Sequence, residues 1–216
     1  MTIRTCVVIG VEGTHAAGKT TLVHALTAHY RARGVLVACT PEPARTSPFI
    51  EETVIHGKGA FDLATEVDLF GAQLSTTLRA ARHHDLLICD KTAINVLAYA
   101  RLVLAAPPGS HEAAVLQAMA AFCRAWAPRT YDAVFFLPDA YTDPADPMRA
   151  KVAHLQDETA TAVRAACAEA GVPLHDVPPG LDLAERVAHL ARRVDALLNP
   201  TGDSLDLRDP GPHAPS

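Results

Sequence analysis

Residues 7–22 read V-V-I-G-V-E-G-T-H-A-A-G-K-T-T-L, and this stretch decides the fold. Inside it, the segment from Gly13 to Thr20 matches the pattern G-x-x-x-x-G-K-[ST] without a mismatch. Such a loop turns backbone amides toward one point at a helix N-terminus, where they surround phosphate groups. Lys19 can then reach the outer phosphates, and the hydroxyl of Thr20 is placed for Mg²⁺. The predicted ATP-binding set is Gly13, Thr14, His15, Ala16, Ala17, Gly18, Lys19, Thr20 and Thr21.

The segments on either side of this loop support the same interpretation. Residues 6–11 form a continuous apolar run, as expected for a strand inside a parallel sheet. After the loop, apolar side chains recur at helical spacing at Leu22, Val23, Leu26 and Tyr30. The loop therefore joins a buried strand to a helix, which is the context that the motif requires.

The composition indicates one domain with a sizeable core, since 49% of the 216 residues are apolar. The formal net charge is −5 and like charges never form a block of five, so we expect no nucleic-acid partner. No apolar run reaches the roughly 18 residues of a membrane span, so we expect no membrane partner. The five cysteines are scattered along the chain, and no two of them form a C-x-x-C motif. This pattern is typical of reduced thiols in a cytoplasmic protein.

Strand and helix patterns alternate along the chain. The apolar runs predict strands at 3–11, 35–39, 86–90, 131–137 and 172–177. Helical spacing predicts helices at 19–33, 48–56, 62–83, 92–105, 111–125, 148–170 and 181–198. This alternation indicates an α/β domain over residues 1–199, with a parallel sheet between helices. A proline in the last strand favours an edge position, and we expect residues 200–216 to be a disordered tail.

Charged side chains follow several of the predicted strands. Glu42 lies between two prolines, in what we expect to be a stiff extended loop, and Asp90 and Lys91 close the third strand. The Pro-rich segment 138–150 follows the fourth strand and contains Arg149. Because ligands of parallel sheets bind at the carboxyl ends of the strands, these residues predict an active site, with segment 138–150 as its lid.

Each of these side chains fits a role in phosphoryl transfer. Asp90 suits Mg²⁺ binding together with Thr20, or else it caps the helix that follows. Glu42 either accepts the proton of an attacking hydroxyl or binds Mg²⁺. Lys91 and Arg149 either stabilise the charge that develops on the transferred group or are solvated charges at helix ends.

Two side chains on the predicted helix 62–83 are candidates for binding a ring. The amide of Gln73 can pair with two adjacent groups of a base, and Phe70 can stack on the ring. The same helix carries an apolar stripe, so Phe70 also fits the core and Gln73 also fits a solvent-facing position. Both interpretations stay open.

These motifs together resemble the P-loop kinases of the thymidylate kinase and deoxynucleoside kinase group. The similarity rests on residues 11–22, on Glu42-Pro43 after the second strand and on Asp90-Lys91 after the third. Residues 90–101 and 131–135 are also similar to small bacterial AAA-type ATPase/kinase domains, which include nicotinamide riboside kinase-like domains.

The resemblance covers about residues 3–198 and implies a three-layer P-loop NTPase fold. It implies a five-stranded parallel sheet in the order 2-3-1-4-5, Mg-ATP as the phosphate donor and a small-molecule acceptor. Glu42 would be the general base, and Arg149 would correspond to a lid arginine. The pair Asp90-Lys91 would correspond to an acid–arginine pair, although lysine lacks the bidentate fork of arginine.

On the acceptor side, the chain departs from the thymidylate kinases. Their phosphate-binding arginine corresponds to Leu74, whereas Gln73 corresponds to the base-reading glutamine of deoxynucleoside kinases. The resemblance therefore implies a nucleoside-like acceptor in preference to a nucleoside monophosphate, unless Arg45 or Arg79 supplies the missing charge. Arg45 joins Glu42, Phe70 and Gln73 as the candidate substrate-binding residues.

Two other classes of protein remain open alternatives. A regulatory ATPase that acts on a protein partner also needs the phosphate loop, but Asp90 is followed by lysine rather than by a second acid. A scaffold with an inactive site would show a degraded loop, and this loop is intact. Whichever class is right, the kinase included, the apolar helices 92–105 and 111–125 could form the face of a homodimer.

Overall fold

The computed structural model describes residues 6–14, 17–45, 47–50, 61–138 and 156–199. Its strands are β1 (Val7–Gly13), β2 (Val37–Thr40), β3 (Leu86–Asp90), β4 (Ala133–Leu137) and β5 (Leu174–Asp176). They form one parallel sheet in the order β2-β3-β1-β4-β5. The expected fold class and strand order are confirmed, and β5 lies at an edge as its proline suggested.

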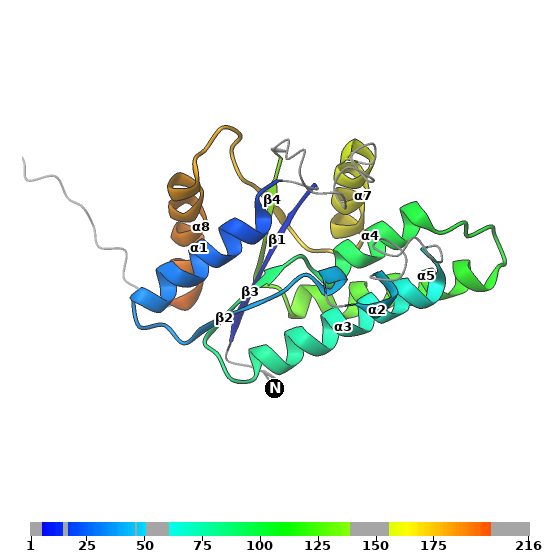
Figure 1. Cartoon of the computed structure of the whole chain (residues 1–216), viewed down its shortest axis with the longest axis horizontal. Helices are drawn as coiled ribbons and strands as arrows, with labels where there is room; N and C mark the ends of the chain where they lie inside the picture. Colours follow the sequence, from blue (N-terminus) through cyan, green and yellow to red (C-terminus); the bar gives the residue numbers. More distant parts are fainter. Residues whose placement is uncertain (1–5, 15–16, 46, 51–60, 139–155, 200–216) are drawn as a thin grey trace, which may run out of the picture.

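Helices cover both faces of this sheet, which gives three layers (Figure 1). One face carries α1 (Lys19–Ala32) and α8 (Leu183–Leu198). The other carries α3 (Leu63–Ala81), α4 (Ala93–Val103), α5 (His111–Trp126) and α7 (Gln156–Glu169). Short helical segments are η1 (Pro43–Arg45), α2 (Pro48–Ile50) and η3 (Ala127–Arg129).

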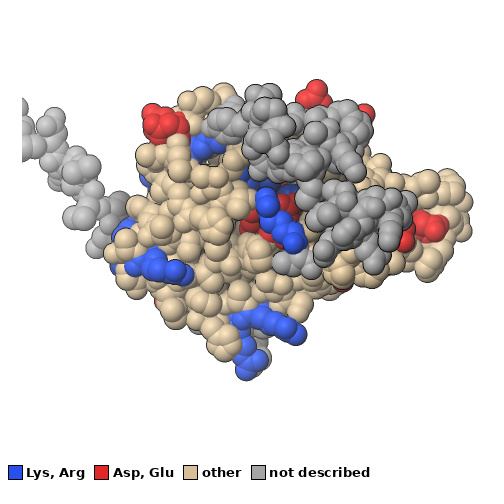
Figure 2. Space-filling view, viewed as in Figure 1, with Lys and Arg blue, Asp and Glu red and all other residues tan. Residues whose placement is uncertain are grey.

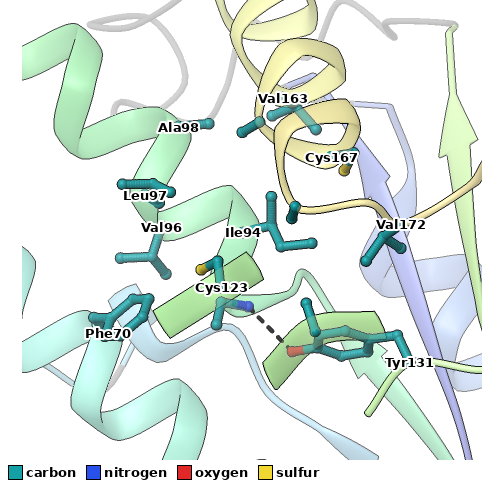
Figure 3. Packing of buried hydrophobic residues seen from close by; sticks show 14 of the residues in the cluster. Phe70, Ile94, Val96, Leu97, Ala98, Cys123, Tyr131, Val163, Cys167 and Val172 are labelled. Carbon is teal, nitrogen blue, oxygen red and sulfur yellow. Dashed lines mark hydrogen bonds between the residues drawn. The ribbon is translucent and has the colours of Figure 1, made fainter. Parts of the chain in front are cut away.

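Successive residues of the central strands point to opposite faces of the sheet. In β3, Leu87 and Cys89 pack toward α3 and α4, whereas Leu86 and Ile88 pack toward α1. Because both faces are covered, these strands appear in the sequence as unbroken apolar runs. Figure 3 shows the core on the α3–α7 side, where the Ala93 amide donates a hydrogen bond of 3.2 Å to the hydroxyl of Tyr131.

Several element boundaries differ from the expected ones. β1 continues to Gly13, and β2 covers residues 37–40 rather than 35–39. The expected extended loop at Glu42 is wrong, because Pro43–Arg45 form a 3₁₀ turn. Proline has a fixed φ that suits the first position of a helical turn, where its missing N–H is not needed.

The expected dimer face is also smaller than the sequence suggested. Residues Ala93 to Ala98 of α4 are buried within the chain, where α4 packs against α3, α5 and α7. The apolar character of α4 therefore reflects a helix in the core of its layer. On α5, Phe122 remains 39% exposed.

Four of the five cysteines are buried, Cys39 is half-buried, and all five are free thiols, in agreement with the sequence. The described helices include none with the length and apolar content that crossing a bilayer requires. Some expected features lie outside the described residues: most of the helix 48–56, the start of the helix 148–170, nearly all of the lid 138–150, and the tail 200–216.

Candidate active site

The phosphate loop connects β1 to α1, and two glycines shape it. Gly13 has φ +146°, and a Cβ there would lie 2.6 Å from the carbonyl oxygen of Leu137, so no side chain fits. Gly18 precedes α1 with φ 79°. Among the described residues, no side chain caps the first turn of α1 and that turn contains no acid. Its amides and the helix dipole are therefore left for an anion.

Lys19 is 7% exposed and folds back over this loop. Its ammonium donates to the carbonyl oxygens of Gly13 at 3.1 Å and Thr14 at 2.5 Å. Burial and the nearby charge of Lys91 lower the pKa of Lys19 to about 8, although neighbouring carboxylates oppose this shift. A bound polyphosphate would supply the negative charge that this lysine lacks.

The other predicted phosphate-binding residues differ in their surroundings. Thr14 is buried, and its hydroxyl has no hydrogen-bond partner among the described residues. The carbonyl of Ala17 accepts a hydrogen bond of 3.1 Å from the buried Arg186 of α8, which supports the loop from behind. Thr21 is exposed in the first turn of α1. Outside the described residues lie His15 and Ala16.

Thr20 and Asp90, the predicted Mg²⁺ pair, are in direct contact. The Thr20 hydroxyl donates to Asp90 Oδ2 at 2.6 Å, and the other carboxylate oxygen of Asp90 is buried without a partner in the described structure. The cap of α4 is Thr92, so helix capping does not explain Asp90. A hydroxyl beside a carboxylate with a free oxygen is an oxygen donor set that fits Mg²⁺.

Glu42 and Lys91, both predicted site residues, form a salt bridge. The Lys91 ammonium lies 2.5 Å from Glu42 Oε1, and the side chains are 11% and 18% exposed. Burial alone would raise the pKa of Glu42, but the charge and hydrogen bond of Lys91, together with the charges of Lys19 and Arg45, lower this pKa to about 2. Burial likewise opposes the charge of Lys91, yet Glu42 raises the pKa of Lys91 above its ordinary value.

Lys91 also has the only positive φ, 74°, among the described residues other than glycine. Its amide donates to the carbonyl of Val11 at 3.2 Å, and its ammonium lies 5.0 Å from the ring centre of Tyr99. The side-chain amide of Gln73 donates to the Lys91 carbonyl at 3.1 Å. These contacts turn the chain so that Asp90 and Lys91, though consecutive, serve different partners.

Gln73 and Phe70 are both buried on α3. The amide group of Gln73 is occupied by Lys91, while its carbonyl oxygen has no partner among the described residues. Phe70 packs edge-on against Phe122, with ring centres 5.8 Å apart, and belongs to the core shown in Figure 3. The structure thus places Phe70 in the core and Gln73 away from solvent, and their contact with an acceptor stays a prediction.

Of the remaining predicted residues, Arg45 lies beside the salt bridge. Its Nε is 3.6 Å from Glu42 Oε2, and its side chain is 51% exposed. Acidic and basic side chains lie together near the centre of the face in Figure 2. Arg149 lies outside the described residues.

Sequence reasoning missed the role of Glu12. This residue is fully buried, and its carboxylate accepts hydrogen bonds from the Thr92 amide at 2.9 Å, the Thr92 hydroxyl at 2.7 Å and Asn95 Nδ2 at 2.6 Å. Burial raises the pKa of Glu12. Glu12 therefore fixes the end of β1 to the start of α4. The available signal was an acid inside an otherwise apolar strand.

No three His, Cys, Asp or Glu side chains of the described residues form a metal-binding group. A metal ion here would take its protein ligands from Thr20 and Asp90, and its other ligands from water and phosphate oxygens. The site can thus bind a nucleotide at the loop and hold a second molecule near Glu42.

Residues 7–186 match a family model described as an AAA domain. Among solved structures, the NadR protein in complex with NR has 20% sequence identity and a TM-score of 0.65, and the match covers 93% of this chain and 54% of NadR. Deoxyadenosine kinase from M. mycoides with bound dATP has 14% identity and a TM-score of 0.55, over 87% of this chain and 99% of that one. Thymidylate kinase from Candida albicans has 15% identity and a TM-score of 0.60, and the match covers 90% of this chain and 93% of that one.

No curated protein matches the chain. The chain spans about half the length of the NadR structure that it matches. At these identities the structural likeness shows a shared fold, and it confirms the P-loop kinase fold expected from the sequence. The family model adds that the resemblance to AAA-type domains is correct. The chain therefore belongs to the AAA domain family and has the fold of the P-loop kinases.

Proposed function

We propose that this protein is an ATP-dependent phosphotransferase that moves the γ-phosphoryl group of Mg-ATP to a hydroxyl of a nucleoside-like small molecule. One observation carries the proposal: two consecutive residues contact the two halves of the site. Asp90 accepts a hydrogen bond from Thr20 at the phosphate loop, and Lys91 pairs with Glu42. A molecule beside Glu42 would thus lie next to the end of a bound triphosphate, as in-line transfer requires.

Glu42 fits the role of orienting the acceptor hydroxyl. With a pKa of about 2 it stays a carboxylate at neutral pH and can accept a hydrogen bond from that hydroxyl. Such a weak base has little driving force to remove a proton early, so we place proton transfer late in the reaction. Of the roles open to Glu42, contact with the acceptor agrees best with its pairing to Lys91.

The positive groups would stabilise the transferred phosphoryl group. Lys19 at the loop and Lys91 beside Glu42 are two of the proposed cations, and Arg149 of the lid is the third. Thr20 and Asp90 would hold Mg²⁺, which neutralises charge on the phosphate oxygens when bound. The ligands NR and dATP in the matched structures, with NAD and AMP-PNP in a second NadR structure, support a nucleotide-type donor and a nucleoside-type acceptor.

ATP consumption should be measured with a panel of nucleosides, their 5′-monophosphates and nicotinamide riboside. We expect turnover only with an acceptor present, and a nucleoside-class acceptor should work better than its monophosphate. Lys19→Ala should reduce kcat/KM by at least about 100-fold through loss of charge stabilisation. Glu42→Gln should lower kcat, while the matched change Glu112→Gln in the first turn of α5 should leave it unchanged.

Two outcomes would contradict the proposal. If ATP binds but no acceptor is phosphorylated, the protein is not this kinase. If ATP is hydrolysed at one rate with or without acceptors, the regulatory ATPase is the better interpretation. Preference for monophosphates would instead favour the thymidylate-type alternative.

A further inference from the structure

A buried stripe with three polar side chains runs along α3 on the side that faces β3. Glu66, Phe70, Gln73 and Thr77 recur at spacings of four, three and four residues, so they share one face of the helix, and all four are buried. Two oxygens of this stripe have no hydrogen-bond partner among the described residues: Glu66 Oε2 and Gln73 Oε1. Buried polar atoms are nearly always paired, so both call for an explanation.

The contacts of the stripe show where Glu66 lies relative to the site. The Thr77 hydroxyl is 4.0 Å from the thiol of Cys89, inside β3, and Gln73 bonds to the carbonyl of Lys91, just past the end of that strand. Earlier residues of α3 thus lie progressively farther beyond the carboxyl end of β3. Glu66, two turns before Gln73, lies in the region where ligands of parallel sheets bind.

A comparison within the molecule argues against a purely structural role for Glu66. Glu12 is also a buried carboxylate, and it accepts three hydrogen bonds from Thr92 and Asn95. Glu66 is 2% exposed and no salt bridge to it occurs within the described structure. A buried carboxyl oxygen without a hydrogen-bond partner weakens a fold, so an atom such as Glu66 Oε2 is typical of a site that a ligand completes.

The charges around Glu66 indicate which ligand it suits. The charge of Lys91 favours the ionised form of Glu66, but that lysine is already paired with Glu42. Asp62 adds a second negative charge and disfavours ionisation of Glu66. Leu74, beside Gln73, is packed against the core. A phosphate group next to Glu66 would be repelled by the carboxylates of Glu66 and Asp62. The first half of α3 contains no lysine or arginine that could offset this repulsion.

We propose that Glu66 is a specificity-determining residue, which binds N–H or O–H donors of the acceptor together with the Gln73 carbonyl and disfavours an acceptor that carries a phosphate. This inference rests on the proposed function, because it assigns the acceptor side of the same site. The acceptor class is an uncharged or cationic nucleoside with hydrogen-bond donors on its ring or sugar.

Equilibrium binding tests the inference without requiring turnover. Calorimetry with AMP-PNP present should compare nucleosides and nicotinamide riboside with their 5′-monophosphates, on the wild type, Glu66→Gln and the matched control Glu112→Gln. We expect at least one nucleoside to bind tenfold or more tightly than its monophosphate. Glu66→Gln should weaken nucleoside binding about tenfold or more, whereas Glu112→Gln should not, and AMP-PNP affinity should be the same in all three proteins.

Equal nucleoside affinity in the wild type and Glu66→Gln would overturn the inference, as would tighter binding of monophosphates or no binding of any acceptor. If Glu66→Gln loses AMP-PNP binding, Glu66→Met provides the second variant and the same criteria apply. A wild type that binds nucleosides through Glu66 but never phosphorylates them would defeat the proposed function alone. If wild type and Glu66→Gln phosphorylate nucleosides equally well, this inference alone is wrong.

Discussion

Lys91 has a backbone conformation that residues with a side chain rarely adopt. A non-glycine residue at φ 74° costs on the order of 1–3 kcal/mol, and it persists only where the surroundings fix it. Here the Val11 carbonyl and the Gln73 amide fix the backbone, and Glu42 fixes the side chain. The strain is therefore located at the residue that links the two halves of the proposed site.

We expect Lys91→Met to lower the free energy of unfolding by about 3 kcal/mol, because Glu42 would remain buried without its cation. The pKa of Glu42 is about 2 in the native protein, so the pair contributes fully above the ordinary pKa of 4.5 and is lost as the pH falls toward 2. Urea unfolding at pH 7 measures the loss. The double variant Glu42→Gln/Lys91→Met should recover most of it, and a single-variant cost below 1 kcal/mol would contradict the prediction.

Glu66 should make stability depend on pH in the opposite sense. Burial raises its pKa from 4.5 to about 7, so the native state binds the proton more tightly than the unfolded chain does. As the pH rises from 4.5 to 7, ionisation of Glu66 should cost about 3 kcal/mol of unfolding free energy. Glu66→Gln should remove this loss, and Glu112→Gln should keep it. Parallel pH profiles for wild type and Glu66→Gln would show that the carboxyl ionises without penalty.

Among the elements, β1 and α4 depend on one shared threonine. Thr92 caps α4 by accepting from the amides of Ile94 and Asn95, and it donates twice to Glu12. Thr92→Val keeps the shape but removes the hydroxyl, which takes away the cap and leaves Glu12 with fewer donors. We expect a loss of about 2–4 kcal/mol in urea unfolding.

Ser110 provides the control for this prediction. It caps α5 by accepting from the Ala113 amide, and its hydroxyl makes no hydrogen bond to a carboxylate among the described residues. Ser110→Ala should therefore cost only about 1 kcal/mol, the typical value of a helix cap. Equal losses in the two variants would mean that the Thr92–Glu12 contact adds nothing to the cap.

The elements differ in how far the sequence predicts them. β3 was predicted with its observed bounds, because a strand covered on both faces is an apolar run that ends at its first charge, Asp90. The phosphate loop was also predicted from the sequence, because its turn needs glycine at fixed positions. The 3₁₀ turn at Pro43 was missed because proline excludes the interior of a helix but not its first position.

The parts of the site that escaped prediction depend on contacts between distant residues. Glu12 and Thr92 are 80 positions apart, and nothing local shows that an acid in a strand will meet a helix N-terminus. Glu66 looks like an ordinary charged residue in the first turn of a helix until burial is known. Contacts between neighbouring strands depend on the strand order, which followed here from the family resemblance and not from any local sequence pattern.

At the scale of the whole molecule, binding of Mg-ATP should stabilise the fold. A ligand that binds only the native state adds about 2.7 kcal/mol at a concentration of 100 Kd. Burial and the charge of Lys91 disfavour the charged form of Lys19 and lower its pKa to about 8. The negative charge of a bound polyphosphate would stabilise this ammonium group. In thermal unfolding, Mg-ATP should raise the Tm of the wild type at a concentration that leaves the Tm of Lys19→Ala unchanged. Equal shifts in both would place the nucleotide away from the loop.

The half-buried thiol of Cys39 makes this chain convenient for labelling. It is the least enclosed of the five cysteines and lies in β2, three residues before Glu42. Alkylating dyes react with accessible thiolates and spare those sealed in a core. The unmodified protein thus offers a single preferred attachment point for a fluorophore, three residues from the proposed acceptor-binding Glu42, without the removal of any native cysteine.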